Sequence, residues 1–332
     1  MGANLEENLT PTGQITTESG HPPGKGQVPP RRVGQAGPMT LRAYRRIALV
    51  AFGSLYAIIV TGALVRLTGS GLGCVDWPAC NESRFIDVSS GHAAIEQLNR
   101  LFTGVVAASV IAAVLAGLRV RPRVPGLVPI ALVLVAGVLA QVVIGGVVVL
   151  TGLNPWSNAL HYLVSVALMT GAWALLRRVG GGPRGGAGPW SSLSARWPML
   201  VLGAAAIVAG TVVTGAGPHA GDERAVRIGV AIRDATRVHG ALVWLTLAAA
   251  LVVIWAGRRR AEVRRAGSLL VVVGASQTAI GYAQYALGLP IPLVALHVAG
   301  SIAAWLAILG LWAAAGPGGP TRSVGDASRV VD

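Results

Sequence analysis

Long apolar runs without charged residues recur along this 332-residue chain. A hydrocarbon core of ~30 Å requires about 20 apolar residues in a helix. No charge occurs from Ala266 to Thr321, so Pro290 and Pro292 are predicted to divide that stretch into two helices. The pattern predicts an all-α integral membrane protein with eight transmembrane helices, near residues 47–67, 97–118, 125–150, 157–176, 198–217, 237–257, 266–287 and 293–314.

Composition and charge agree with a membrane protein. Hydrophobic residues make up 53% of the chain and charged residues 12%, which is unusual for a soluble domain of this length. The net charge of +14 is concentrated before the first run and between runs two and three, four and five, and six and seven. Basic loops stay cytoplasmic, so both termini are predicted to be cytoplasmic in a bacterial plasma membrane. The basicity therefore indicates topology in a lipid bilayer, and no nucleic acid is expected as a partner.

The segments outside the apolar runs suggest the domain boundaries. Residues 1–40 are rich in Pro, Gly, Gln and Thr and are predicted to be a disordered cytoplasmic tail, as are residues 316–332. Residues 181–197 are predicted to be a cytoplasmic linker between halves at 41–180 and 198–315. No cleavable signal peptide is visible, so the first span is expected to act as an uncleaved anchor.

The two halves share an internal repeat. A constant offset of 136 residues (277 − 141 and 297 − 161) superposes Gln141 on Gln277 and His161 on His297, with an Ile-Gly pair following each glutamine. Aligning the preceding spans places Asn99 where the second half has His239. The chain is therefore predicted to be an internal duplication that places one imidazole at an equivalent position in each copy.

Three histidines fall near the outer ends of predicted spans, at similar depth: His161, His239 and His297. A single histidine in a membrane helix is more often a hydrogen-bonded polar residue between helices. Three at one depth favour a metal or a haem. A large b-type haem suits this arrangement, because imidazoles from two helices can bind its iron on the two axial sides. His239 and His297 would make such a pair within the second half.

The second span of the first half begins with polar residues that could line a reactive site. If His92 lies on an outward extension of this helix, His92, Glu96 and Asn99 share one face. Ser89 or Ser90 could cap such an extension. On that face Glu96 is a candidate for catalytic proton handling. The alternative is a surface ion pair with Arg100, worth a few tenths of a kcal/mol.

Two arginines at the edge of the apolar region, Arg66 and Arg100, could pair with haem propionates as fixed cations. Alternatively they mark the membrane interface by snorkelling. The predicted extracellular loop 67–95 contains both cysteines of the chain, Cys74 and Cys80. A structural disulfide, a redox-active pair and two free thiols remain open for them.

The segment from Thr61 to Cys80 (TGALVRLTGSGLGCVDWPAC) resembles the first-loop signature of heme A synthase (CtaA family), and the Glu96-x-x-Asn99-Arg100 segment and the three late histidines fit it too. The resemblance implies two pseudo-symmetric four-helix bundles. The first would bind haem O as substrate and oxidise its C8 methyl group to the formyl of haem A for terminal oxidases, with Glu96 as catalytic acid. The second would hold a haem b cofactor on His239 and His297.

One residue departs from that pattern, because many members have a histidine where this chain has Asn99. Either His161 alone holds the substrate iron, or His92 moves in, or Asn99 positions a water. The resemblance also suggests partners: haem O delivered by haem O synthase, an electron acceptor of unidentified class and a thiol–disulfide oxidoreductase. The choice between a monomer and a homo-oligomer stays open.

Two other classes compete. A di-haem b-type cytochrome for quinol electron transfer would use the same histidines without needing Glu96. A secondary transporter would explain duplicated halves. Transporters usually break helices near the membrane centre, however, whereas the polar residues here gather at helix ends.

Overall fold

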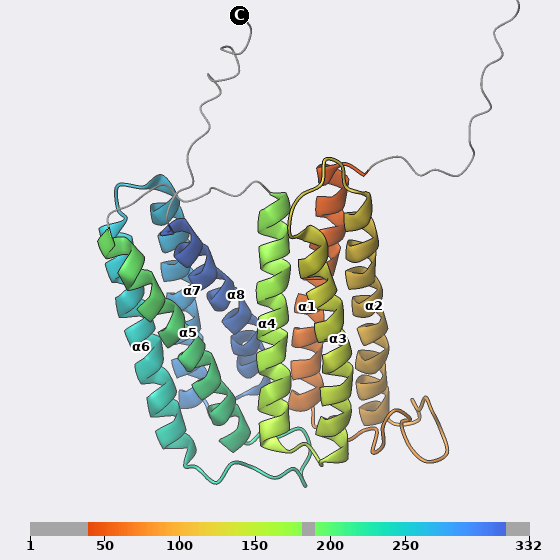
Figure 1. Ribbon diagram of the computed structural model, residues 1–332. Coiled ribbons are helices and arrows are strands. Elements are labelled where there is room, and N and C mark those ends of the chain that lie inside the picture. The colour runs from red at the N-terminus through yellow and green to blue at the C-terminus, as the bar shows by residue number, and fades with distance from the viewer. Residues whose placement is uncertain (1–38, 181–189, 317–332) are drawn as a thin grey trace, which may run out of the picture. The chain divides into compact units, whose positions relative to one another are not determined.

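The computed structural model describes residues 39–180 and 190–316, and these residues form eight α-helices without a β-strand (Figure 1). Each helix is long and apolar enough to cross a membrane, as predicted. The predicted tails fall almost entirely outside the described residues, as does most of the predicted linker. The helices are α1 (Leu41–Leu67), α2 (Gly91–Arg119), α3 (Leu127–Leu150), α4 (Pro155–Val179), α5 (Trp190–Ala216), α6 (Ile232–Ala256), α7 (Ala261–Ala286) and α8 (Ile291–Ala314).

Several helices begin earlier than the apolar pattern predicts. Helix α1 starts after Thr40, whose hydroxyl accepts from Ala43 N, and α2 starts after Ser90, whose hydroxyl accepts from Ala93 N. Such caps satisfy free N–H groups of the first turn, so polar residues can extend a helix beyond its apolar part. The extension of α2 that would carry His92 is therefore present. Helix α5 likewise begins at Trp190 instead of residue 198.

The repeat is visible in the backbone of two turns. In the α3–α4 turn, Gly152 and Leu153 have φ of 60° and 62°, and in the α7–α8 turn Gly288 and Leu289 have φ of 75° and 62°. Each pair is related by the 136-residue offset (288 − 152 and 289 − 153). A left-handed conformation costs a leucine roughly 1–2 kcal/mol. Its recurrence at matched positions shows that the two turns are built alike. The turn before α8 also confirms the predicted break at Pro290 and Pro292.

Each half closes as a ring of four helices. Helices α1 and α3 both pack against α2 and α4, and α5 and α7 both pack against α6 and α8. Helices α2 and α4 therefore lie opposite each other in the first half, as α6 and α8 do in the second. Contacts between the halves come from α1 and α4 on one side and α5 and α8 on the other.

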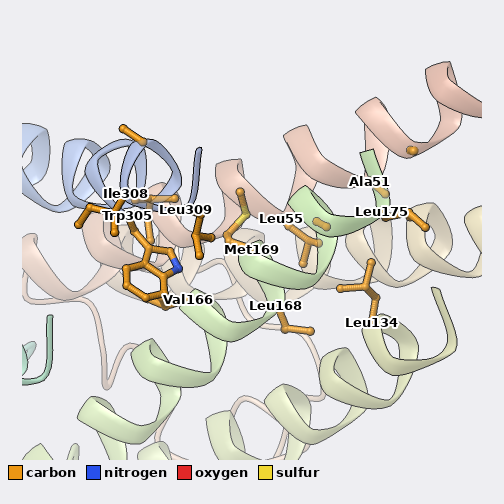
Figure 2. Packing of buried hydrophobic residues seen from close by; sticks show 14 of the residues in the cluster. Ala51, Leu55, Leu134, Val166, Leu168, Met169, Leu175, Trp305, Ile308 and Leu309 are labelled. Carbon is orange, nitrogen blue, oxygen red and sulfur yellow. The ribbon is translucent and has the colours of Figure 1, made fainter. Parts of the chain in front are cut away.

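Buried apolar side chains fill the seam between these helices (Figure 2). Leu55 of α1 and Met169 of α4 belong to the same cluster as Trp305 of α8. Hydrogen bonds also cross the seam. Tyr162 Oη lies 2.6 Å from Ser301 Oγ, and Trp305 Nε1 donates to Thr170 Oγ1 over 2.8 Å. In a bilayer each such bond is worth roughly 0.6 kcal/mol, so close packing provides most of the cohesion.

Candidate functional site

A cavity of about 1180 Å³ lies among the helices, and all eight contribute to its lining. This volume exceeds the ~300–1,000 Å³ typical of small-molecule sites. The predicted site residues that line it are Arg66, Glu96, Asn99, Arg100, His161, His239 and His297. The fold therefore brings together side chains that lie far apart in the sequence.

In the second half, His239 of α6 and His297 of α8 face each other with ring centroids 6.3 Å apart and ring planes at 84°. His239 Nδ1 donates to Ala206 O over 2.9 Å, which leaves Nε2 free for a metal. Two imidazole–metal bonds of about 2.0–2.1 Å and the size of two rings require roughly 6.4 Å between centroids. The pair therefore fits the two axial ligands of a haem.

A glycine on the neighbouring helix lies against each of four candidate side chains. A methyl group added at Gly210 would lie 3.3 Å from His239 Cε1, and one at Gly281 would lie 3.3 Å from His297 Cε1. In the first half the corresponding distances are 3.6 Å from Gly145 to His161 Cε1 and 3.9 Å from Gly62 to Asn99 Nδ2. Small residues let side chains approach a neighbouring helix closely. Asn99 therefore occupies the position in its half that His239 occupies in the other. These glycines were not predicted from the sequence, where many similar glycines surround them.

In the first half, the imidazole of His161 faces the cavity, and its buried Nδ1 has no hydrogen-bond partner among the described residues. The repeated glutamine, Gln141, bonds to α4 and not to the imidazole of His161. Its Nε2 donates to His161 O over 2.9 Å and to Ser165 Oγ over 2.5 Å. Asn99 is held from the other side, since Thr61 Oγ1 donates to Asn99 Oδ1 over 2.8 Å.

His92 does not reach the cavity. It is exposed, its Nδ1 lies 2.9 Å from Ser70 Oγ, and it is absent from the cavity lining. Helix α2 extends outward as the spacing required, but at this level the α1–α2 loop packs on the helix. A methyl group added at Gly73 would lie only 2.3 Å from His92 O. The loop thus separates His92 from the cavity that Glu96 and Asn99 line.

The predicted ion pair between Glu96 and Arg100 is present, but it is not on the surface, because Glu96 is only 5% exposed. Its Oε1 accepts from Arg100 Nη2 over 2.7 Å and from Nε over 3.0 Å, while Oε2 accepts from Cys74 N over 2.8 Å. Arg100 also donates to Asp76 O and Ala79 O. The pair therefore clamps the cysteine-containing loop to α2, with Glu96 at the cavity wall. Arg100 has most of its donors committed to this clamp and not to a cavity ligand.

Arg66 lies at the boundary between the halves. It lines the cavity and donates from Nη2 to Thr214 O of α5 over 2.6 Å, while its buried Nε has no partner among the described residues. The side chain is therefore directed into the protein instead of snorkelling to an interface. The Arg66 side chain borders a cavity in which an anionic group could lie.

The α1–α2 loop covers the first-half end of the cavity. Cys74 and Cys80 form a disulfide, and both are almost completely buried. Between them, Trp77 inserts beside α3: a methyl group added at Gly146 would lie 2.6 Å from Trp77 Cδ2. Trp77, Pro78 and Phe85 line the cavity. Sequence reasoning missed the role of Trp77, because only the fold shows which helix receives it.

Beyond this covering segment the loop is exposed and internally hydrogen-bonded. Ser89 N and Asn81 Nδ2 donate to the Asp87 carboxylate. Hydrogen bonds from Ser89 and Asn81 lower the pKa of that carboxyl. Across the described ranges, no group of three or more His, Cys, Asp or Glu side chains is arranged to hold a bare metal ion.

Two further contacts involve the loops, one between the halves and one within the second half. Gly71 N donates to Gly221 O over 2.9 Å, and Leu153 packs against both glycines. His219 Nε2 donates to Leu289 O over 2.8 Å, so this cavity-lining histidine supports the α7–α8 turn. The strained leucines of the repeat therefore anchor the loops that close the cavity.

A comparison with models of known protein families gives a match over more than half of the chain. The model of the cytochrome oxidase assembly protein family (COX15-CtaA) matches residues 45–227. The chain belongs to this family. The family match contains Cys74, Cys80, Glu96, Asn99 and His161, and it confirms the resemblance to the heme A synthase (CtaA) family inferred from the sequence.

Curated relatives of the family align with only part of this chain. A heme A synthase of Geobacillus kaustophilus is 34% identical over 106 residues, covering 32% of this chain and 33% of that protein. A heme A synthase of Bacillus pumilus is 32% identical over 126 residues, covering 37% of this chain and 41% of that protein. The chain therefore aligns over less than half the length of these relatives.

Proposed function

We propose that this protein is a heme A synthase, an oxidoreductase that converts the C8 methyl group of haem O to the formyl group of haem A. One observation carries the proposal: the second half has two facing histidines, whereas the corresponding positions in the first half hold Asn99 and His161. Asn99 and His161 line the same cavity as a buried carboxylate, Glu96. Family membership and relatives named heme A synthase support the reaction class.

In this proposal, His239 and His297 hold a haem b cofactor. Bound there, haem b supplies one-electron redox chemistry that side chains cannot provide. The Ala206 carbonyl orients His239 through Nδ1, which presents Nε2 to the cavity. Gly210 and Gly281 leave room for both rings to lie close to their neighbouring helices.

The first half would bind haem O as the substrate, with its iron on His161. Conversion of a methyl to a formyl group is a four-electron oxidation that removes hydrogen from the carbon and adds one oxygen atom. It therefore needs an external oxygen source and an external electron acceptor, and it requires proton transfer at the site. Glu96 is the carboxylate at the cavity wall, and its Oε2 contacts a backbone N–H while Oε1 contacts Arg100. It would accept a proton there, and the Arg100 guanidinium would hold the carboxylate in place. Trp77 and Pro78 would exclude water above the substrate.

The proposed setting is a bacterial plasma membrane, with both termini cytoplasmic and the cavity near the extracellular helix ends. The distribution of basic loops supports this orientation. Two four-helix bundles at 41–180 and 198–315, joined by a linker, would be the two domains, which the closed helix contacts within each half support. A thiol–disulfide oxidoreductase would have to open the loop before reaching the buried cysteines.

The test is the pigment of the purified full-length protein, co-expressed with a source of haem O. Extracted haems identified by mass should include haem B together with haem O or haem A. Haem B alone, filling two sites, would instead indicate a di-haem cytochrome for quinol electron transfer. A folded but colourless protein would contradict both functions and leave the transporter.

A further inference from the structure

The position that Asn99 occupies suggests a ligand site. We infer that the first-half haem has one open axial position, on the side of α2, and that this position binds a small neutral ligand such as CO, NO or O₂. The inference rests on the proposed function, because it requires haem in both halves. It concerns the coordination of the first haem and not the reaction itself.

The first step is the equivalence of positions in the two rings of helices. Helices α6 and α8 lie opposite each other and carry the facing pair His239 and His297. Helices α2 and α4 lie opposite each other in the same way and carry Asn99 and His161. The glycine neighbours agree, since Gly62 lies beside Asn99 as Gly210 lies beside His239. A haem held by His161 would therefore present its other face to Asn99.

The second step is the chemistry of the amide. An imidazole is a strong ligand for haem iron, whereas a neutral carboxamide offers a weak oxygen acceptor and an NH₂ donor. Thr61 Oγ1 already donates to Asn99 Oδ1 over 2.8 Å. That bond engages the oxygen and leaves the Nδ2 hydrogens, which donate and do not coordinate. Asn99 thus lines the open side without closing it.

The third step is that the nearby polar side chains are engaged elsewhere. His92 is exposed, lies beside Ser70 and is outside the cavity lining. Both carboxylate oxygens of Glu96 accept hydrogen bonds, from Arg100 and from Cys74 N. No candidate that the sequence offered for the second axial ligand is therefore positioned to serve.

The class of ligand follows from these surroundings. The polarity and hydrogen-bond donors of a distal pocket decide which small ligands a haem accepts. Here the amide N–H groups of Asn99 can donate to a neutral diatomic ligand, while the Glu96–Arg100 ion pair has no net charge. The second-half haem has both axial positions filled by His239 and His297, so it should exclude such ligands.

The experiment uses reduced full-length protein with its haems quantified by mass, titrated with CO and followed by absorption difference spectra. In the wild-type protein, one haem of the two should bind CO. Asn99→His should decrease CO affinity at least tenfold and convert that haem to a six-coordinate, low-spin spectrum. Asn99→Gln, which keeps an amide, should retain CO binding.

A matched variant tests the same idea in the other half, even if Asn99→His does not fold. His239→Asn should create a second CO-binding haem. A wild-type protein that holds both haems but binds no CO would overturn the inference, as would unchanged CO binding in Asn99→His. Absence of haem would instead contradict the proposed function, and CO binding without haem A formation would contradict only the reaction.

Discussion

The two halves present different side chains in the same local frame. His239 in the second half and Asn99 in the first lie on corresponding helices, each beside a glycine of the preceding helix. Only the second half has two facing imidazoles, 6.3 Å apart. In the proposed function, the second half would therefore hold its haem by two imidazoles and the first half by one, a difference that comes from Asn99.

The halves also differ in how the cavity is bounded. Gly146 in the first half corresponds to Tyr282 in the second (282 − 146 = 136). The absence of a side chain at Gly146 makes room for Trp77, which comes from a loop. Tyr282 instead receives a hydrogen bond from Trp244 Nε1 over 3.2 Å, within the helices. A loop can move aside without breaking the helical packing, which suits a substrate site better than a permanent cofactor site.

The largest effect is expected from His297→Ala. Losing one of the two axial imidazoles would leave the second-half haem on His239 alone, so this haem should dissociate more readily and total haem per purified protein should fall, by at most about half. Haem extraction and absorption spectra measure this loss. His219→Ala is the matched control, because His219 lines the same cavity but donates to Leu289 O. Equal haem loss in both variants would contradict the assigned pair.

Glu96→Gln tests the proposed role of the buried carboxylate in the first half. The amide keeps an acceptor near Cys74 N but removes the charge that pairs with Arg100. Loss of a proton-transfer group typically costs 10²–10⁴-fold in rate, so haem A formation should fall by at least ~100-fold. Haem B content should stay unchanged. The control is Glu262→Gln, because Glu262 is exposed in the first turn of α7, and this variant should leave both measurements as in the wild type. Full haem A formation in Glu96→Gln would refute the catalytic role.

Gly146→Ala tests the contribution of the loop. The added methyl group would lie 2.6 Å from Trp77 Cδ2, so the indole must move. Overpacking of this kind costs roughly 1–3 kcal/mol, and we expect about tenfold weaker retention of haem O with faster proteolysis of the loop. Gly104→Ala is the control, because nothing lies within 4 Å of the added group. Similar behaviour of the two variants would show that Trp77 does not cover the substrate site.

The smallest effect should come from the glycines beside the imidazoles. A methyl group at Gly210 would lie 3.3 Å from His239 Cε1, whereas one at Gly145 would lie 3.6 Å from His161 Cε1, an ordinary contact. Gly210→Ala should shift the absorption bands and midpoint potential of the second haem slightly. Gly145→Ala should change neither haem measurably. A larger shift in Gly145→Ala would reverse the comparison.

Much of the frame could be predicted because it depends on local properties. Apolar runs long enough to span a bilayer predict the eight helices, and Pro290 and Pro292 predict the turn before α8. The early start of α1 was not predicted, because a capped polar turn carries no hydrophobic signal, and the early start of α2 was raised only as a possibility from its serine cap. The left-handed Leu153 and Leu289 could not be expected either, since leucine rarely adopts that conformation.

The candidate site, like the fold, could be predicted only in part from the sequence. Its members Glu96, His161, His239 and His297 were identified from residue type and repeat, and all line one cavity. Other features depend on how the α1–α2 loop folds over α2 and α3. These are the hydrogen bond from Cys74 N to Glu96, the contact that holds His92 beside Ser70 and outside the cavity, and the insertion of Trp77. Loop positions follow from many weak tertiary contacts that sequence spacing does not encode.

By itself, the sequence determined the number of helices, the 136-residue repeat and the mismatch between Asn99 and His239, because hydrophobic length and residue identity are one-dimensional properties. Only the tertiary structure decided that α2 and α4, like α6 and α8, lie opposite each other. It also decided that His92 is excluded from the cavity and that Glu96 is buried against Arg100. These outcomes depend on helix packing and loop closure, which bring distant segments within hydrogen-bonding distance.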